Sequence, residues 1–319
     1  MDRANIINGP AIITFKGQSF YTEGDIELNP GITFGEINTA MHGKVDSFID
    51  DIVAEITFTP AGQWLADHLA VLFPYATPVI GSSIFGATDS DVTIQTLAGQ
   101  LITWKAGAIT KMPDLILSAV KPALGAVTIA CIGENATAWD DSAKRAVVAA
   151  TAFSDASFDP ADIKMAAYIA AITGASAPWD AIQSQDGWTI SFDVKVEPVK
   201  TDALGTVDMR IGGVTAVAKC IPVAISEAQL IAKLPLQGTG IARGARLSGL
   251  GADLTITGPN VGDPIVVLKN AVLSTGSLKF GATALRTGEI AFECAVTFTA
   301  GVRNALFTVG SVPEPDPEA

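Results

Sequence analysis

The side chains with catalytic potential are few and scattered along the sequence. Of the two histidines, His42 lies in a predicted turn and His68 follows Asp67 in a predicted helix. Acid–base catalysis or metal binding would need further ligands or a nucleophile in the same pocket, and no spacing in the sequence indicates them. We interpret both histidines as surface or packing residues. The sequence predicts no catalytic, cofactor-binding or metal-binding residues and no enzymatic activity.

Four carboxylates lie close together in the segment DSFIDDIVAE, namely Asp46, Asp50, Asp51 and Glu55. Carboxylate oxygens are the ligands that Ca²⁺ prefers, but the segment lacks the ligand spacing of an EF-hand loop. We interpret it as an exposed acidic turn or hairpin.

Three further segments match a motif in their letters but not in their context. SAVK (118–121) has the S-x-x-K spacing of acyl-transfer enzymes, yet it lies in a strand-like run rather than at a helix start. GTGIARG (238–244) resembles a phosphate-binding loop without the G-x-G-x-x-G spacing, so we predict a glycine-rich loop. NAT (135–137) is a glycosylation sequon, but the N-terminal residues lack a signal peptide's apolar core.

The cysteines indicate neither a disulfide framework nor a zinc site. Cys131, Cys220 and Cys294 are widely spaced, odd in number and without a C-x-x-C pair. We predict buried free thiols, which fit synthesis in a reducing cytosol.

Composition narrows the class of protein further. The chain has 319 residues, a hydrophobic fraction of 49% and a net charge of −13. Gripping nucleic acid needs clustered Lys and Arg, so this acidic chain is a poor candidate for it. No window of sufficient length lacks both charges and helix breakers, and we predict no membrane span. The length predicts two domains.

The most informative feature is an internal repeat. The segment GKVDSFIDDIVAEITFTP (43–60) aligns without a gap with GTVDMRIGGVTAVAKCIP (205–222), 162 residues later. Six of the eighteen positions are identical: Gly43/Gly205, Val45/Val207, Asp46/Asp208, Ile49/Ile211, Ala54/Ala216 and Pro60/Pro222. His42 and His68 align with Leu204 and Leu230, so the repeat does not require histidine.

The similarity extends along about 125 residues of each copy. Upstream, 32–43 aligns with 194–205, and downstream DVTIQT aligns with DLTITG. After a two-residue shift Lys105 aligns with Lys269, and Cys131 aligns with Cys294. One order of segments used twice indicates one fold used twice.

Each copy has the pattern of short strands with one helix. Runs such as DVTIQT and AVTIACI are rich in Val, Ile and Thr and are separated by Gly, Pro and Asp. The segment from Pro60 to Phe73 predicts a helix with Thr59 as N-cap, and 226–234 predicts another with Ser226 as N-cap. We therefore predict a mainly β fold, a β-sandwich or barrel with a flanking helix, duplicated in tandem.

The repeat also predicts the domain boundaries. We expect a first β domain over 1–135, a short helical connector over 136–186, a second β domain over 187–310 and a disordered acidic, proline-rich tail over 311–319. The second connector helix would begin at Asp159 and Pro160, with Asp162 in its first turn, and would end at Gly174.

Several of these segments resemble major tail proteins of long-tailed bacteriophages. They are DDIVAEITFTPAGQW, LFPY, SIFGATDSDVTIQTLAGQLITWKAGAITKMPDLILSAVKPALGAVTI and DPADIKMAAYIAAITGASAPWDAIQSQDGWTISFDVKV. The resemblance covers most of the first copy and reaches the second copy through the repeat. It implies a tail tube protein with two tandem tube-like domains, whose β-sandwiches and flanking helices form six-fold rings that stack into a hollow tube.

The resemblance also implies the partners and location. Three chains of two domains would form a trimeric, pseudo-hexameric ring, and the acidic lumen would conduct DNA during genome ejection without binding it specifically. The other partners would be the tape measure, terminator and distal tail or baseplate proteins, with no membrane involved. The protein would be made in the bacterial host cytoplasm and reside in the virion tail.

Three alternatives remain open at this point. One is an enzyme on a β scaffold, which would need a clustered pocket of Asp, His and Ser side chains. Tandem tube-like domains also occur in tail hub or adaptor proteins, which do not polymerise. A non-viral binding module of two β-sandwiches is the alternative from another class.

Overall fold

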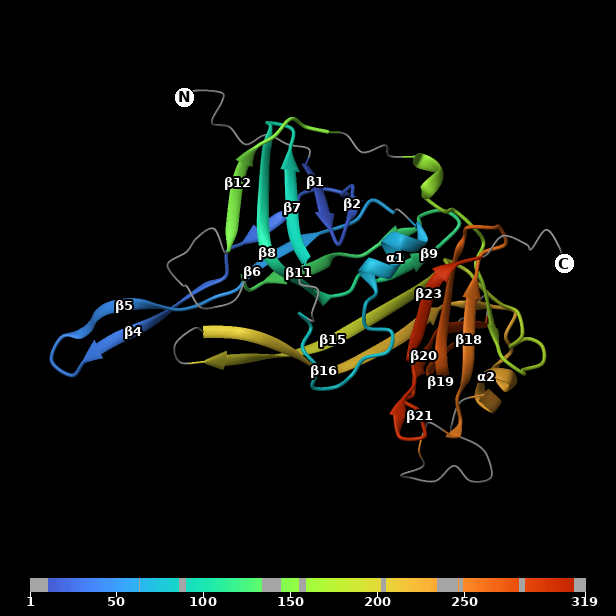
Figure 1. Ribbon diagram of the computed structural model, residues 1–319. Helices are drawn as coiled ribbons and strands as arrows, with labels where there is room; N and C mark the ends of the chain where they lie inside the picture. Colours follow the sequence, from blue (N-terminus) through green and yellow to red (C-terminus); the bar gives the residue numbers. More distant parts are fainter. Residues whose placement is uncertain are drawn as a thin grey trace.

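The computed structural model describes residues 11–62, 64–85, 90–133, 145–154, 159–201, 205–233, 246, 249–280 and 285–312. Strands dominate these residues, which confirms the mainly β fold. Two large antiparallel sheets contain most of the strands (Figure 1).

The first sheet belongs entirely to the N-terminal half of the chain. Its strands are β1 (Ala11–Phe15), β2 (Gln18–Phe20), β3 (Glu27–Asn29), β6 (Ala54–Phe58), β7 (Ser90–Thr96), β8 (Gln100–Lys111), β11 (Val127–Cys131) and β12 (Ala146–Ala150). Between β3 and β6 the chain forms a separate two-stranded sheet of β4 (Ile32–Thr39) and β5 (Gly43–Ile52), and α1 (Ala66–Leu72) follows β6.

The second sheet contains the C-terminal half plus one hairpin from the first half. Its strands are β9 (Leu115–Leu117), β10 (Ala123–Leu124), β13 (Ile169–Ile172), β14 (Ile182–Ser184), β15 (Trp188–Thr201), β16 (Gly205–Cys220), β17 (Pro222–Val223), β18 (Ala252–Thr257), β19 (Pro264–Phe280), β20 (Leu285–Cys294) and β23 (Phe307–Ser311). The remaining elements are α2 (Glu227–Lys233) and the small hairpin of β21 (Phe298–Thr299) and β22 (Val302–Arg303).

The two large sheets have the same strand order, which confirms the tandem duplication. The first runs β2-β1-β7-β8-β11-β6-β3, with β12 paired to β8. The second contains β14-β13-β18-β19-β20-β16-β15 in corresponding positions, with β23 paired to β19. We call residues 11–150 the first repeat and residues 169–311 the second repeat.

The central hairpins of the two repeats also share one register. In β4–β5, Thr39 opposes Gly43 and Ile32 opposes Ile52, while in β15–β16, Thr201 opposes Gly205 and Val194 opposes Val214. Each hairpin has a β-bulge at the same two positions of its second strand, where the residue has no partner in the register. These residues are Val45 and Asp50 in the first repeat and Val207 and Gly212 in the second. Such bulges bend and twist a strand, so both hairpins have the same built-in shape.

A second irregularity recurs where β8 and β19 pass the preceding strand. Ala106 and Asn270 both have positive φ, at 55° and 48°, although neither is glycine. Directly before each of them a lysine bonds an aspartate, Lys105 to Asp91 at 2.6 Å and Lys269 to Asp253 at 2.7 Å. The repeat therefore preserves a kink and the ion pair beside it.

The predicted helical connector is wrong for the described residues of that segment. Residues 145–154 and 159–186 contain β12, β13 and β14, and the only helical turn there is a 3₁₀ turn at Pro160–Asp162. β12 is the last strand of the first repeat and pairs with β8, whereas β13 is the first strand of the second repeat and pairs with β18. Strand partners outweigh the helix propensity of the alanines here.

The first helix is shorter than predicted. α1 begins at Ala66, with Leu65 and not Thr59 in the cap position, while Ser226 caps α2 as expected. Leu69 and Leu230 each donate a backbone N–H to the cap residue's carbonyl and are fully buried. Leu230 is therefore the structural counterpart of Leu69 and not of His68.

The two repeats share a continuous apolar core. The ring of Phe192 lies 5.0 Å from Phe73 of the first repeat and 4.6 Å from Phe307 of the second. α1 contacts β23, and the backbone N–H of Leu306 donates to Ala76 O at 2.8 Å. This packing holds the repeats in one fixed relation.

Candidate functional site: the interface between the repeats

The structure places the two histidines in different environments. His42 is exposed in the turn of β4–β5. His68 is buried on α1, with Nε2 3.0 Å from Ser19 O and its ring edge-on to Phe20 at 5.0 Å. His68 therefore packs α1 against β2.

The acidic segment behaves differently from the predicted exposed turn. Asp46 and Asp50 are exposed on β5, and Glu55 is exposed on β6, but Asp51 is only 5% exposed. The described part of the chain contains no group of three or more His, Cys, Asp or Glu side chains able to hold a metal ion. The prediction of an exposed segment is thus wrong for Asp51 because a second hairpin covers it.

Asp51 joins the base of β4–β5 to the tip of β15–β16. Its Oδ1 accepts the Thr206 backbone N–H at 2.9 Å, and its Oδ2 accepts the Thr206 hydroxyl at 2.5 Å. Lys200 Nζ lies 2.9 Å from the same Oδ2. Burial alone would raise the pKa of Asp51, but the Thr206 hydrogen bonds and the Lys200 charge outweigh it and lower the pKa. The carboxylate therefore stays charged and saturated with donors.

The loop after α1 adds backbone pairing along β16. Gly81 N–H donates to Ile211 O at 2.8 Å, Ile211 N–H donates to Ser82 O at 3.0 Å, and Ile84 N–H donates to Met209 O at 2.9 Å. The Ser83 hydroxyl donates to the Asp208 carboxylate. This loop of the first repeat thus occupies the edge of β16 that β20 leaves open near the hairpin tip.

A third contact extends the second sheet. β9 pairs antiparallel with β15, with Leu117 opposite Trp188 and Leu115 opposite Ile190. β9 and β10 continue from β8 and β11 of the first repeat, so the first repeat contributes two strands to the second sheet. The interface between the repeats therefore consists of strand pairing, loop pairing and a buried carboxylate.

The equivalent surfaces of the first repeat lack these coverings. Leu28 is 36% exposed where its counterpart Ile190 is 0% exposed. Likewise Ile32 and Ile49 are 42% and 49% exposed, whereas Val194 and Ile211 are 8% and 5% exposed. In Figure 1 the β4–β5 hairpin projects from the body in the same direction as β15–β16, and most of the residues in its outer part are exposed. We call β4–β5 the arm.

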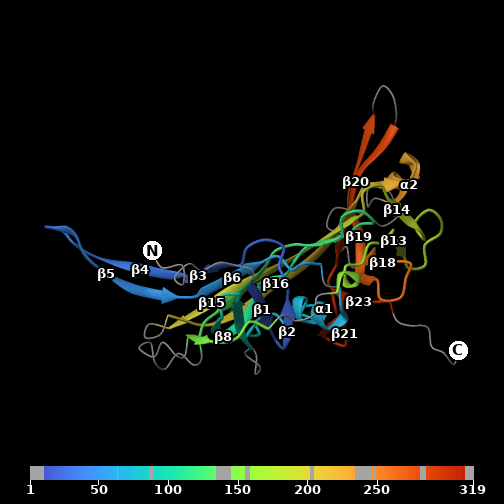
Figure 2. The ribbon, with the colours of Figure 1, turned by 90° about the horizontal axis from the view of Figure 1, so that it is seen from above.

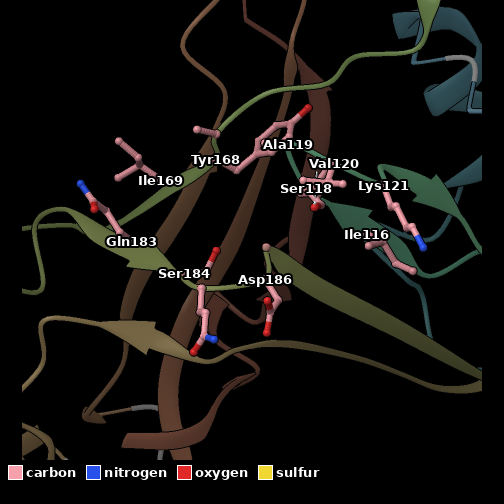
Figure 3. Close-up of a pocket in the computed structure, with 14 residues that line it drawn as sticks. Ile116, Ser118, Ala119, Val120, Lys121, Tyr168, Ile169, Gln183, Ser184 and Asp186 are labelled. Carbon is pink, nitrogen blue, oxygen red and sulfur yellow. Dashed lines mark hydrogen bonds between the residues drawn. The ribbon is translucent and has the colours of Figure 1, made fainter. Parts of the chain in front are cut away.

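A cavity of about 550 Å³ lies where β9–β10 approaches β13 and β14 (Figure 3). Ser118 and Lys121, the two defining residues of the S-x-x-K match, are among its lining residues. The Ser118 hydroxyl accepts the Val120 backbone N–H at 3.3 Å, and Figure 3 shows the Lys121 amine apart from both Ser118 and Asp186. The cavity therefore lacks the nucleophile–base contact that acyl transfer requires.

The cysteines are free, as the described structure shows. Cys131 and Cys220 are buried and Cys294 is partly buried. Burial raises the pKa of each thiol to about 12, so none is a ready nucleophile. The GTGIARG and NAT segments lie outside the described residues.

No protein-family model matches the chain, and no curated protein matches it. None of the helices in the described ranges has the length and apolar character needed to cross a bilayer. Sequence reasoning found the repeat that creates this interface but missed Asp51, because Asp50 beside it has the same letter and faces solvent.

Proposed function

We propose that this chain is a structural virion protein that forms a bacteriophage tail tube. Three chains assemble into a pseudo-hexameric ring of six repeats, and the rings stack around a lumen that conducts DNA. The observation that carries the proposal is the unequal burial of equivalent surfaces. The second repeat has its hairpin covered by the first repeat, whereas the described residues of the first repeat expose the equivalent surface.

Physical chemistry favours assembly over a free monomer. A two-stranded hairpin with both faces in water is marginally stable, and the arm exposes Phe34, Met41 and Phe48 to solvent. Exposed apolar groups of this kind mark surfaces that another protein covers. Closing a ring also removes sheet edges, which otherwise invite unspecific pairing.

The charge fits a conduit better than a nucleic-acid clamp. A net charge of −13 repels phosphates, so DNA can slide past an acidic wall without being held. The described cavities and side-chain clusters offer no catalytic arrangement that would favour an enzyme. Tape measure, terminator and distal tail or baseplate proteins are the further partners of such a tube.

The test is electron microscopy of the purified protein together with size-exclusion chromatography over a range of concentrations. We expect ring-shaped trimers or hollow tubes of regular width. A variant in which residues 35–47 are replaced by a tight two-residue turn removes the outer arm and leaves the core untouched. It should remain a folded monomer by circular dichroism and form no rings.

Other outcomes separate the competing functions. Closed rings that never stack would favour a tail hub or adaptor over a tube. A folded monomer at high concentration, with no rings even when other tail proteins are added, would contradict every self-assembling role.

A further inference from the structure

The contact between the two repeats within one chain provides a template for a contact between two chains. Within the chain, the first repeat supplies β9 to the edge of β15, and the tip of β15–β16 reaches back to Asp51 at the base of the arm. Each of these four surfaces has a counterpart in the other repeat, and the four counterparts have no such mutual contact in the described structure.

The first free counterpart is the edge strand β3. β3 pairs with β6 in the register in which β15 pairs with β16, with Leu28 opposite Ile56 and Ile190 opposite Ala218. β3 is the edge strand of the first sheet, whereas the equivalent edge of β15 is paired with β9. Leu28 is consequently exposed, and β3 presents an edge on which one more strand fits.

The matching strand is the distal end of β19. The pair Thr275–Ala291 in the second repeat corresponds to Lys111–Thr128 in the first. Beyond this pair the first repeat bends into β9 and β10, while in the second repeat β19 and β20 stay paired with each other as far as Phe280 and Leu285. Figure 2 shows this end of β19 and β20 projecting from the body.

The second pair of free surfaces is the arm and the base of β15–β16. At the arm tip Lys44 corresponds to Thr206, and at the base of the other hairpin Gly213 corresponds to Asp51. The Glu197 carboxylate lies beside this base, since a Cβ placed on Gly212 would meet its Oε1 at 3.0 Å. A cation at the arm tip and an anion at the base are therefore available, as Lys200 and Asp51 are in the internal contact.

We propose that a second copy of this chain docks its first repeat on the free face of the second repeat. The distal end of β19 then pairs antiparallel with β3 of the next chain, with Lys279 opposite Leu28 and Phe280 opposite Glu27. The arm of the next chain lies along the base of β15–β16, where Lys44 meets Glu197. This interface deepens the proposed ring assembly and rests on it, but not on DNA or on any other tail protein.

The contact within the chain and the proposed contact between chains are consistent, because in both of them the partner that supplies the edge strand also receives the other partner's hairpin tip. In the internal template one neighbour gives its β9 strand and receives the other's hairpin tip. In the proposed contact one chain gives β19 and receives the next chain's arm. Such a head-to-tail contact is heterologous, and repetition through a closing rotation makes a ring. The ion pairs that Lys44 and Glu197 make in the single chain, with Glu36 and Lys195, are exposed and weak, so exchanging them costs little.

Cysteine pairs test the arm contact directly. Lys44→Cys combined with Gly213→Cys should give an interchain disulfide under mild oxidation, seen as dimers and higher bands on non-reducing gels. A Cβ at Gly213 meets only Lys195 Cβ, at 4.0 Å, so the substitution fits. The control Asp51→Cys with Thr206→Cys occupies the internal template and should crosslink within one chain, without dimer bands. Lys44→Cys with Val223→Cys combines the arm tip with an exposed position outside the proposed contact and should give no specific dimer.

A second variant tests the strand contact. Leu28→Lys places a charge on the open edge of β3, where it opposes the addition of another strand. Because Leu28 is exposed, the substitution should not disturb the fold of the monomer. We expect unchanged circular dichroism and melting of the monomer, with loss of rings. Ile190→Lys is not a matched control, because Ile190 is buried. The control is Thr22→Lys, which lies before β3 and should leave the rings unchanged.

The outcomes separate this interface from the proposed function. Rings or tubes without the Lys44–Gly213 crosslink, or rings that persist in Leu28→Lys, would overturn the interface and leave the tube in place. Absence of any assembly by the wild type would overturn both. Crosslinked rings with the expected loss in Leu28→Lys would support the interface.

Discussion

The hairpins β4–β5 and β15–β16 have one backbone and two environments. They share strand register, both bulges and a glycine of positive φ after the turn, Gly43 at 67° and Gly205 at 66°. Yet the other repeat covers both outer edges of β15–β16, with β9 on β15 and residues 81–84 on β16, whereas the outer part of the arm is exposed. The comparison teaches that local sequence determines hairpin geometry, while burial depends on which neighbour the chain itself supplies.

The two hairpins also differ in the residues that they have at equivalent positions. Asp51 of the arm corresponds to Gly213, and Phe48 corresponds to Arg210. The Phe48 ring packs across Gly35, where a Cβ would meet it at 2.3 Å. The arm thus covers part of its own apolar surface with the Phe48 ring.

The largest expected difference between the hairpins comes from one pair of equivalent isoleucines. Ile211→Ala should lower the free energy of unfolding by about 2–5 kcal/mol, because it removes a buried side chain and leaves a cavity. Ile49→Ala should change it by at most about 0.5 kcal/mol in the monomer, because Ile49 is exposed. Urea denaturation of dilute monomer measures both. Equal losses would mean that the arm is also covered in the monomer.

The carboxylate between the hairpins should have the next largest effect. Asp51→Ala leaves the Thr206 N–H and hydroxyl without their acceptor, which should cost about 1–3 kcal/mol of unfolding free energy. Glu55→Ala, four residues later and exposed, is the matched control and should be near neutral. A similarly small loss in both variants would show that Asp51 does not join the repeats.

Acidification tests the same contact without mutation. Because the folded pKa of Asp51 lies below 3.8, the carboxylate's contribution is present above that value and is lost as pH falls through the folded pKa. Asp253 has a lowered pKa as well, since Lys269 and the Asn270 N–H outweigh its burial. The wild type should lose stability below about pH 4. Asp51→Asn should lose less over the same range in acid-titrated melting curves, and an unchanged slope would contradict the assignment.

The smallest expected effect separates the two equivalent ion pairs. Asp91→Asn should cost about 0.2–1 kcal/mol, because the Lys105–Asp91 pair is partly exposed. Asp253→Asn should cost more, since Asp253 also accepts the Asn270 backbone N–H at 3.0 Å beside the positive-φ kink. Parallel thermal melts compare them. A larger loss for Asp91→Asn would reverse the ranking.

The repeat, the strand-rich fold and the equivalence of Lys105 with Lys269 and of Cys131 with Cys294 followed from the sequence alone, because the aligned segments keep the same order and the same strand register. The described residues 145–154 and 159–186 form strands where helices were predicted, because AVVAA and YIAAI favour helix and strand similarly until a sheet edge provides hydrogen-bond partners. The candidate interface was predicted only in outline. Strand order, the buried state of Asp51 and the extension of the second sheet by β9 depend on contacts between distant residues.

Period and spacing are local properties that a sequence records directly, so they determined the elements and their duplication. Burial is a property of the packed chain, because it depends on which surfaces meet. Leu28 and Ile190 occupy the same place in the repeat, and both are apolar. Only the tertiary structure distinguishes them, because β9 reaches one edge and no described strand of the same chain reaches the other.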